Sequence, residues 1–138
     1  ENKVDDISIS DGPKGIEFLV DFKFYPDSPE LLPAERTRIQ KIYEMLSEIM
    51  TDNSYTVLVE GHTADVGKPV GQMNLSIERT RTVMKALVSE GLDEKLFTYK
   101  GYGGTMPVAT NETEEGRAQN RRVIITARPR ATYIQRDW

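Results

Sequence analysis

The chain alternates segments of β-strand periodicity with two segments of α-helical periodicity. In the first helical segment, residues 33–50, apolar side chains recur at steps of three and four residues, and Pro33 stands where a first helical turn tolerates proline. The second helical segment covers about residues 74–90 and stops at Gly91, a residue type that suits the end of a helix. Because strand-like runs flank both helical segments at short connections, the sequence predicts helices that cover one face of a sheet.

The expected strands are rich in β-branched and aromatic residues. Residues 7–20 hold two alternating runs around an Asp-Gly-Pro turn, which is typical of a hairpin. The second run extends to Phe22 and Phe24, on the same face as Val20. The expected strands are residues 7–9, 16–24, 55–60, 97–102 and 123–126, with a short helical turn near residues 113–120. The predicted fold is an α+β two-layer sandwich: a mixed sheet of four to five strands with two main helices and one short helix on one face.

Composition excludes several classes of function. The chain has no cysteine and one histidine, His62, so disulfides, thiol catalysis and an ordinary zinc site are excluded. No serine stands in a nucleophile elbow, and His62 is expected to hydrogen-bond the loop backbone at a strand end. The net charge of −4 argues against general affinity for nucleic acid. We therefore expect no enzyme activity, no cofactor and no bound metal.

Arg79 stands out because it is charged on the apolar side of the second helical segment. At 100° per residue it lies between Leu75 and Val83, on the arc that also carries Leu87. One interpretation is an arginine whose stem packs at the edge of the core and whose head pairs with a nearby glutamate. The other is a guanidinium at the floor of a cleft, which binds a carboxylate. The glycine-rich segment 61–71 precedes this helix, and backbone amides there favour an anion.

A second polar cluster, residues 111–122, ends in Arg121 and Arg122. Asn111 or Thr113 is expected to cap the short helical turn, with glutamates in its first turn. The two arginines then enter a strand, where neighbouring side chains point to opposite faces, so at most one of them is expected to serve a given site. The alternative is a solvated basic edge that discourages strand pairing.

Four segments of the chain match one family pattern in order and at similar spacing. They are Val20 to Leu32 with Phe24 and Asp27-Ser28; Gly61-His62-Thr63 with Gly67; Leu75-Ser76-x-x-Arg79 with Val83; and Gly101-Tyr102-Gly103 with Pro107, Asn111, Thr113 and Gly116-Arg117-Ala118-x-Asn120-Arg121-Arg122-Val123. Together they resemble the OmpA C-terminal domain family, which outer-membrane porins, peptidoglycan-associated lipoproteins and MotB-type proteins share. The resemblance covers about residues 18–127 and implies the element order β-α-β-α-β-(α)-β. It divides the chain into a lead-in (residues 1–17), a domain (18–128) and a polar tail (129–138).

The resemblance implies a periplasmic domain, associated with the outer membrane or cell envelope, that binds peptidoglycan non-covalently. In the family, a loop aspartate and a helix arginine hold the charged ends of the diaminopimelate in the stem peptide. The arginine corresponds to Arg79, and Asn120 and either Arg122 or Arg121 correspond to positions that line or support the ligand. The implied partner is peptidoglycan and not nucleic acid. A membrane would be reached only through segments outside this chain, and a homodimer remains open.

The loop departs from the family pattern. Thr63 matches the family's threonine, but the family's aspartate falls on Ala64, and Asp65 comes one position late. Gln72 stands where many members have asparagine. If a shift of the glycine-rich loop lets Asp65 substitute, peptidoglycan binding is retained, with ornithine or lysine as alternative diamino acids. Otherwise the clasp has lost an arm worth roughly 1.5–3 kcal/mol, and the domain serves as a structural or protein-interaction module. The expected ligand-contacting residues are Thr63, Ala64, Asp65, Gln72, Arg79, Asn120, Arg121 and Arg122.

Overall fold

The computed structural model describes residues 2–4, 6–52 and 54–130. These residues form one six-stranded sheet in the order β1-β2-β3-β6-β4-β5, in which β4 and β5 are parallel and the other neighbours antiparallel. The strands are β1 (Asn2–Val4), β2 (Ile7–Gly12), β3 (Gly15–Val20), β4 (Tyr55–His62), β5 (Phe97–Gly101) and β6 (Arg122–Pro129). The helices are η1 (Pro33–Glu35), α1 (Arg36–Ile49), α2 (Pro69–Glu90), η2 (Glu94–Leu96) and α3 (Glu114–Asn120). No helix within the described ranges is long and apolar enough to cross a membrane.

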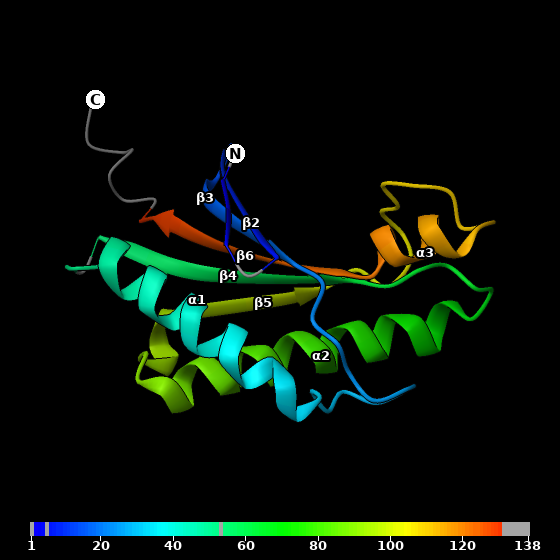
Figure 1. The fold of residues 1–138 in the computed structure, drawn as a ribbon, viewed down its shortest axis with the longest axis horizontal. Coiled ribbons are helices and arrows are strands. Elements are labelled where there is room, and N and C mark those ends of the chain that lie inside the picture. Colours follow the sequence, from blue (N-terminus) through cyan, green and yellow to red (C-terminus); the bar gives the residue numbers. More distant parts are fainter. Residues whose placement is uncertain (1, 5, 53, 131–138) are drawn as a thin grey trace.

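Two helices, α1 and α2, lie against one face of the sheet (Figure 1). Alternate strand residues point toward them, and strand register brings these residues together: Val57 pairs with Ala127, Val59 with Ile125, and Ile125 with Phe18. The helical side chains that complete the buried core are Ile39, Ile42, Leu46, Val83 and Leu87. The core therefore forms between the helical layer and one face of the sheet, as the two periodicities predict.

The α+β class, the mixed sheet and the two-helix layer are confirmed, with differences of detail. The sheet has six strands because Asn2–Val4, within the expected lead-in, pairs with β2. The short helix α3 lies at the end of the sheet beside the start of β6, and not in the layer of α1 and α2 (Figure 1). Pro129 belongs to β6, residue 130 is also described, and the expected tail from residue 131 on lies outside the described residues.

Two further boundaries differ from the expectation. Helix α2 begins at Pro69 instead of residue 74, because a first helical turn accepts proline, and this shortens the preceding loop to residues 63–68. Strand β3 ends at Val20 and does not continue through Phe24, which forms a single bridge with Leu31. The segment after β3 thus becomes a separate turn beside α2, and this turn forms part of the site.

Helix α2 crosses the ends of β4 and β5 at very short range. A Cβ atom at Gly101 would collide with the backbone nitrogen of Ile77, and one at Gly61 would lie 2.5 Å from Thr80 Cγ2. Glycine in a strand often marks such a close approach of another element. The approach places the first turns of α2 directly beside the loop that follows β4.

Candidate functional site

An open cavity of about 700 Å³ lies where β4 ends. Its walls come from the segment after β3, loop 63–68, helix α2 and the junction of α3 and β6. Six of the eight expected ligand-contacting residues line it: Thr63, Ala64, Gln72, Arg79, Arg121 and Arg122. Asp65 and Asn120 are not among the lining residues.

Arg79 is held by the turn that follows β3. Its Nε donates to the carbonyl oxygen of Ser28 (2.9 Å), and Nη2 donates to that of Tyr25 (3.4 Å). The guanidinium also lies 4.5 Å from the centroid of the Phe24 ring, a favourable cation–π arrangement. None of the described glutamates pairs with it, and Nη1 has no partner among those residues. The turn therefore orients the guanidinium without neutralising it.

The buried face of α2 differs from the predicted arc. At the N-terminal half of the helix the buried side chains are Gln72, Ser76 and Thr80, which pack near the strand ends. Leu75 and Arg79, one turn apart, lie beside that row and line the cavity. The arginine thus projects into the site and not into the core.

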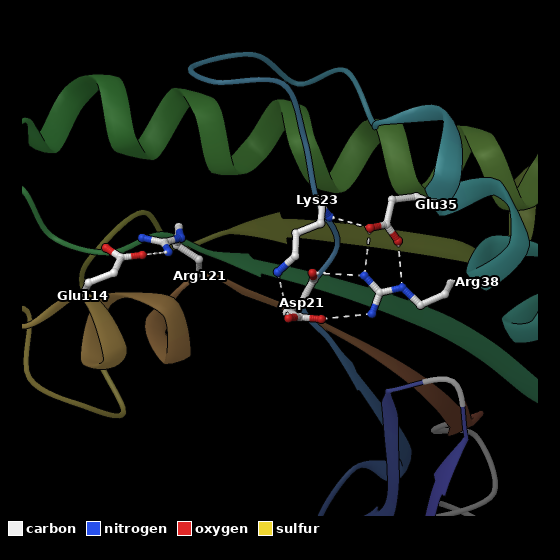
Figure 2. A network of polar contacts seen from close by, with 6 residues as sticks. All are labelled: Asp21, Lys23, Glu35, Arg38, Glu114 and Arg121. Carbon is white, nitrogen blue, oxygen red and sulfur yellow. Dashed lines mark hydrogen bonds and ion pairs between the residues drawn. The ribbon is translucent and has the colours of Figure 1, made fainter.

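Two more arginines add positive charge to the cavity. Arg121 lies close enough to Arg79 that its charge lowers the pKa of Arg79, after the larger effect of burial. Arg121 Nη2 binds Glu114 Oε2 at 2.6 Å (Figure 2). Arg122 donates to two carbonyl oxygens, one of them that of Met106 (3.0 Å), and burial lowers its pKa. Half-buried guanidiniums bound to carbonyls keep their charge, which favours an anionic ligand.

Arg121 and Arg122 both line the cavity, so the expectation that at most one could serve the site is wrong. Arg121 caps α3 with φ −80° and ψ 93°, and only Arg122 belongs to β6. The alternation of side chains along a strand therefore does not apply to this pair.

In loop 63–68, the carboxylate of Asp65 points toward the backbone of the loop itself. Asp65 Oδ1 accepts hydrogen bonds from Gly67 N (3.0 Å) and Gln72 Nε2 (3.5 Å), whereas the neighbouring Ala64 lines the cavity. Thr63 is buried, and its hydroxyl donates to the carbonyl oxygen of Ala64. None of the residues that line the cavity from this loop, Thr63, Ala64, Val66 and Lys68, is an acid.

Two buried amides hold the loops around the cavity. Gln72 Oε1 accepts from the backbone N–H groups of Val66 (2.8 Å) and Lys68 (3.0 Å), and so stabilises the entry into α2. Asn120 is fully buried, and its Oδ1 accepts from the N–H groups of residues 108 and 109 at 2.7 and 3.0 Å. The sequence left open whether Asn120 lines or supports the ligand site. In the structure Asn120 supports the loop that contains residues 108 and 109.

His62, at the end of β4, is buried and lines the cavity. Its ring stacks on Tyr102 with centroids 5.0 Å apart, and its Nδ1 has no partner in the described part of the chain, so the expected hydrogen bond to the loop backbone is wrong. Burial, with a contribution from Arg122, lowers its pKa to about 4. The imidazole is therefore neutral at physiological pH. Within the same ranges, no group of His, Asp and Glu side chains could hold a metal ion.

Sequence reasoning missed four charged residues that line the cavity: Asp21, Lys23, Asp27 and Lys68. A network places Lys23: its N–H donates to Glu35 Oε2 (3.0 Å) and its Nζ to Asp21 Oδ2 (3.0 Å), and Arg38 binds both acids (Figure 2). The three-residue spacing of Glu35 and Arg38 was the available signal for this network.

Comparison with known proteins gives consistent matches. The pattern of the OmpA family matches residues 23–121. Over 110 residues, 80% of this chain, the sequence is 34% identical to outer membrane protein A of Bordetella avium, of which it covers 55%. Over 120 residues it is 30% identical to the peptidoglycan-associated lipoprotein of Pseudomonas aeruginosa, and this match covers 87% of this chain and 68% of that protein.

A solved structure has the same fold. The cell wall anchor of the T6SS from Pseudomonas aeruginosa matches with a TM-score of 0.75 at 27% identity, over 90% of this chain and 88% of that one. This chain spans about half the length of the Bordetella relative, so the comparisons describe a domain and not that whole protein. The matched residues include Arg79, Arg121 and most of the cavity wall. The chain belongs to the OmpA family.

Proposed function

We propose that this chain binds cell-wall peptidoglycan non-covalently and anchors the protein that carries it to the wall. The observation that carries the proposal is the Arg79 guanidinium, which two backbone carbonyls orient in an open cavity and no described acid pairs with. A half-buried guanidinium of this kind is best compensated by a carboxylate. The names of two relatives, a peptidoglycan-associated lipoprotein and a cell wall anchor, support the choice of ligand.

The carboxylate would be that of the diamino acid in the peptide stem. Arg79 and Arg121 repel each other across the cavity, and an anion between them removes this repulsion. The chain would work in the periplasm as a part of the cell envelope. It would hold its ligand by charge and hydrogen bonds, without changing it chemically.

The second candidate is a domain that has kept the fold and lost the ligand. The specific observation in its favour is the loop: Ala64 lines the cavity where the family has an acid, and Asp65 binds its own loop. Such a domain would act as a structural or protein-interaction module, and it would not bind the isolated wall.

Co-sedimentation with purified sacculi tests the proposal. We expect the wild-type chain to sediment with sacculi at tens of micromolar protein, and Arg79→Ala to lose most of this binding. The loss of a charged hydrogen bond to the ligand corresponds to roughly 1.5–3 kcal/mol, or about 10- to 100-fold in affinity. Arg81→Ala is the matched control, because Arg81 lies exposed on the same helix and does not line the cavity.

Thermal unfolding separates a binding defect from a folding defect. Arg79 also fastens the turn after β3, so Arg79→Ala is expected to lower the stability slightly while it leaves the fold intact. Absence of wild-type sedimentation, or equal sedimentation of Arg79→Ala and the wild type, would rule out the proposed role of Arg79.

A further inference from the structure

Asn111 does not cap α3, although it is one of the two residues that the sequence offered for this role. The cap is Thr113, whose side-chain oxygen accepts from Gly116 N at 3.0 Å. Asn111 is partly buried in the segment between β5 and α3, and it does not line the cavity. Its Oδ1 accepts two other hydrogen bonds, from the backbone N–H of Asp65 (3.0 Å) and from Asn120 Nδ2 (2.8 Å). One atom therefore joins parts of the chain that are 46 and 9 residues away from it.

The backbone determines which atom of Asn111 faces these partners. Asn120 Oδ1 accepts from the N–H groups of Val108 (2.7 Å) and Ala109 (3.0 Å), and backbone N–H groups can only donate. The other side-chain atom of Asn120 is then its amide nitrogen, which donates to Ala109 O (3.0 Å) and to Asn111. Because both groups that face Asn111 are donors, its position requires an acceptor.

These hydrogen bonds connect two walls of the cavity. On one side, Asp65 belongs to loop 63–68, four residues of which line the cavity. On the other side, Asn120 directly precedes the two arginines of the cavity. Arg122 donates to Asn120 O (3.2 Å) and to a carbonyl oxygen of the segment between β5 and α3 (3.0 Å). The segment that holds Arg122 is thus the one that Asn111 ties to the loop.

The loop has little other restraint on this side. In the described part of the chain, one further hydrogen bond joins it to the segment between β5 and α3, from Thr63 N to Gly103 O (2.8 Å). That bond fixes the loop where it leaves β4, whereas the Asn111 bond fixes it at Asp65, beside Ala64. Asp65 is exposed, so water would replace Asn111 as the acceptor of its N–H and would not hold the loop. A site whose walls must be ordered during binding has a lower affinity.

From this geometry we propose that Asn111 is a positioning residue of the cavity. Its Oδ1 keeps loop 63–68 and the wall that carries Arg122 at a fixed separation, and the ligand touches these walls but not Asn111. This inference rests on the proposed peptidoglycan binding and adds a residue that controls affinity from outside the cavity. It does not depend on which group of the ligand each wall contacts.

Two substitutions separate the acceptor function of Asn111 from its other contributions. Asn111→Ala removes the acceptor, whereas Asn111→Asp keeps an oxygen at the same place. The aspartate loses no bond, because Asn111 Nδ2 donates to no residue in the described ranges. In co-sedimentation with purified sacculi, we expect Asn111→Ala to weaken binding about three- to tenfold, the effect of one hydrogen bond, and Asn111→Asp to recover most of this loss.

Thr110→Ala is the matched control in the same segment. The Thr110 hydroxyl accepts from Glu112 N (3.1 Å), a local hydrogen bond that does not reach loop 63–68, so this variant should bind sacculi as the wild type does. Hydrogen exchange of the free chain adds a readout on the loop itself. The Asp65 amide should exchange about three- to tenfold faster in Asn111→Ala, and at the wild-type rate in Asn111→Asp and Thr110→Ala.

The outcomes distinguish this inference from the proposed function. If the wild type sediments with sacculi and Asn111→Ala does so equally well, the inference is wrong and the proposed function stands. The inference is also wrong if Asn111→Asp binds as weakly as Asn111→Ala, or if the Asp65 amide exchanges at the same rate in Asn111→Ala and the wild type. Absence of wild-type sedimentation overturns the proposed function itself.

Discussion

Burial lowers the pKa of three basic side chains around the cavity, but it changes the charge of only one of them. It lowers the pKa of Arg79 and Arg122, but arginine starts so far above neutrality that both remain charged. His62 starts at 6.5, and burial brings it to about 4, so it is neutral. The cavity therefore has permanent positive charge from arginine, beside an uncharged and stacked imidazole.

His62 predicts a specific pH dependence of stability. Because its folded-state pKa lies below its unfolded value, the unfolded chain takes up a proton between about pH 6.5 and pH 4 that the folded chain does not. Stability is therefore lost as the pH falls through this window, by about 2 kcal/mol at pH 5. His62→Phe keeps an aromatic ring to stack on Tyr102 and removes the titration.

Urea denaturation at several pH values measures this effect. The free energy of unfolding of His62→Phe should decline less steeply than that of the wild type between about pH 7 and pH 5. Parallel curves for the two proteins would mean that His62 titrates normally in the folded state, and the account of its burial would fail.

Among the elements, α2 combines two functions along its length. Its C-terminal half contributes Val83 and Leu87 to the core. Its N-terminal half packs against the strand ends with small and polar side chains. That close passage requires glycine at positions 61 and 101, because a Cβ atom at Gly61 or Gly101 would collide with α2. The position of Arg79 relative to the cavity therefore depends on glycines in two strands.

A pair of glycine substitutions tests this dependence. At Gly101, alanine would collide with the α2 backbone at Ile77, and we expect Gly101→Ala to lower the free energy of unfolding by about 1–3 kcal/mol. At Gly71, inside α2, a Cβ atom meets nothing within 4 Å, so Gly71→Ala should raise it by about 0.5–1 kcal/mol. Urea denaturation of both variants decides the matter. Equal stability of Gly101→Ala and the wild type would show that the helix has space to move.

Over the whole molecule, periodicity predicted the two-layer fold and the family pattern predicted the position of the cavity. The orientation of single polar groups could not be predicted, because it depends on long-range contacts. Arg79 donates to carbonyl oxygens 51 and 54 residues earlier in the chain. The position of the turn that carries them, after β3, does not follow from the pattern of the strands. The direction of Asp65 likewise depends on hydrogen bonds within its own loop. Strand β1 could not be predicted because its three residues are too few to show a periodicity.

The central claim is tested most directly by measuring how much the ligand carboxylate contributes to binding at Arg79. Isothermal titration compares a soluble stem peptide whose diamino acid ends in a free carboxylate with the same peptide amidated there, on the wild type and on Arg79→Ala. We expect amidation to weaken wild-type binding about 10- to 100-fold and to have little effect on the variant, the signature of a direct pair. Equal affinity of the wild type for both peptides would contradict the claim that Arg79 holds this domain to the wall through a carboxylate.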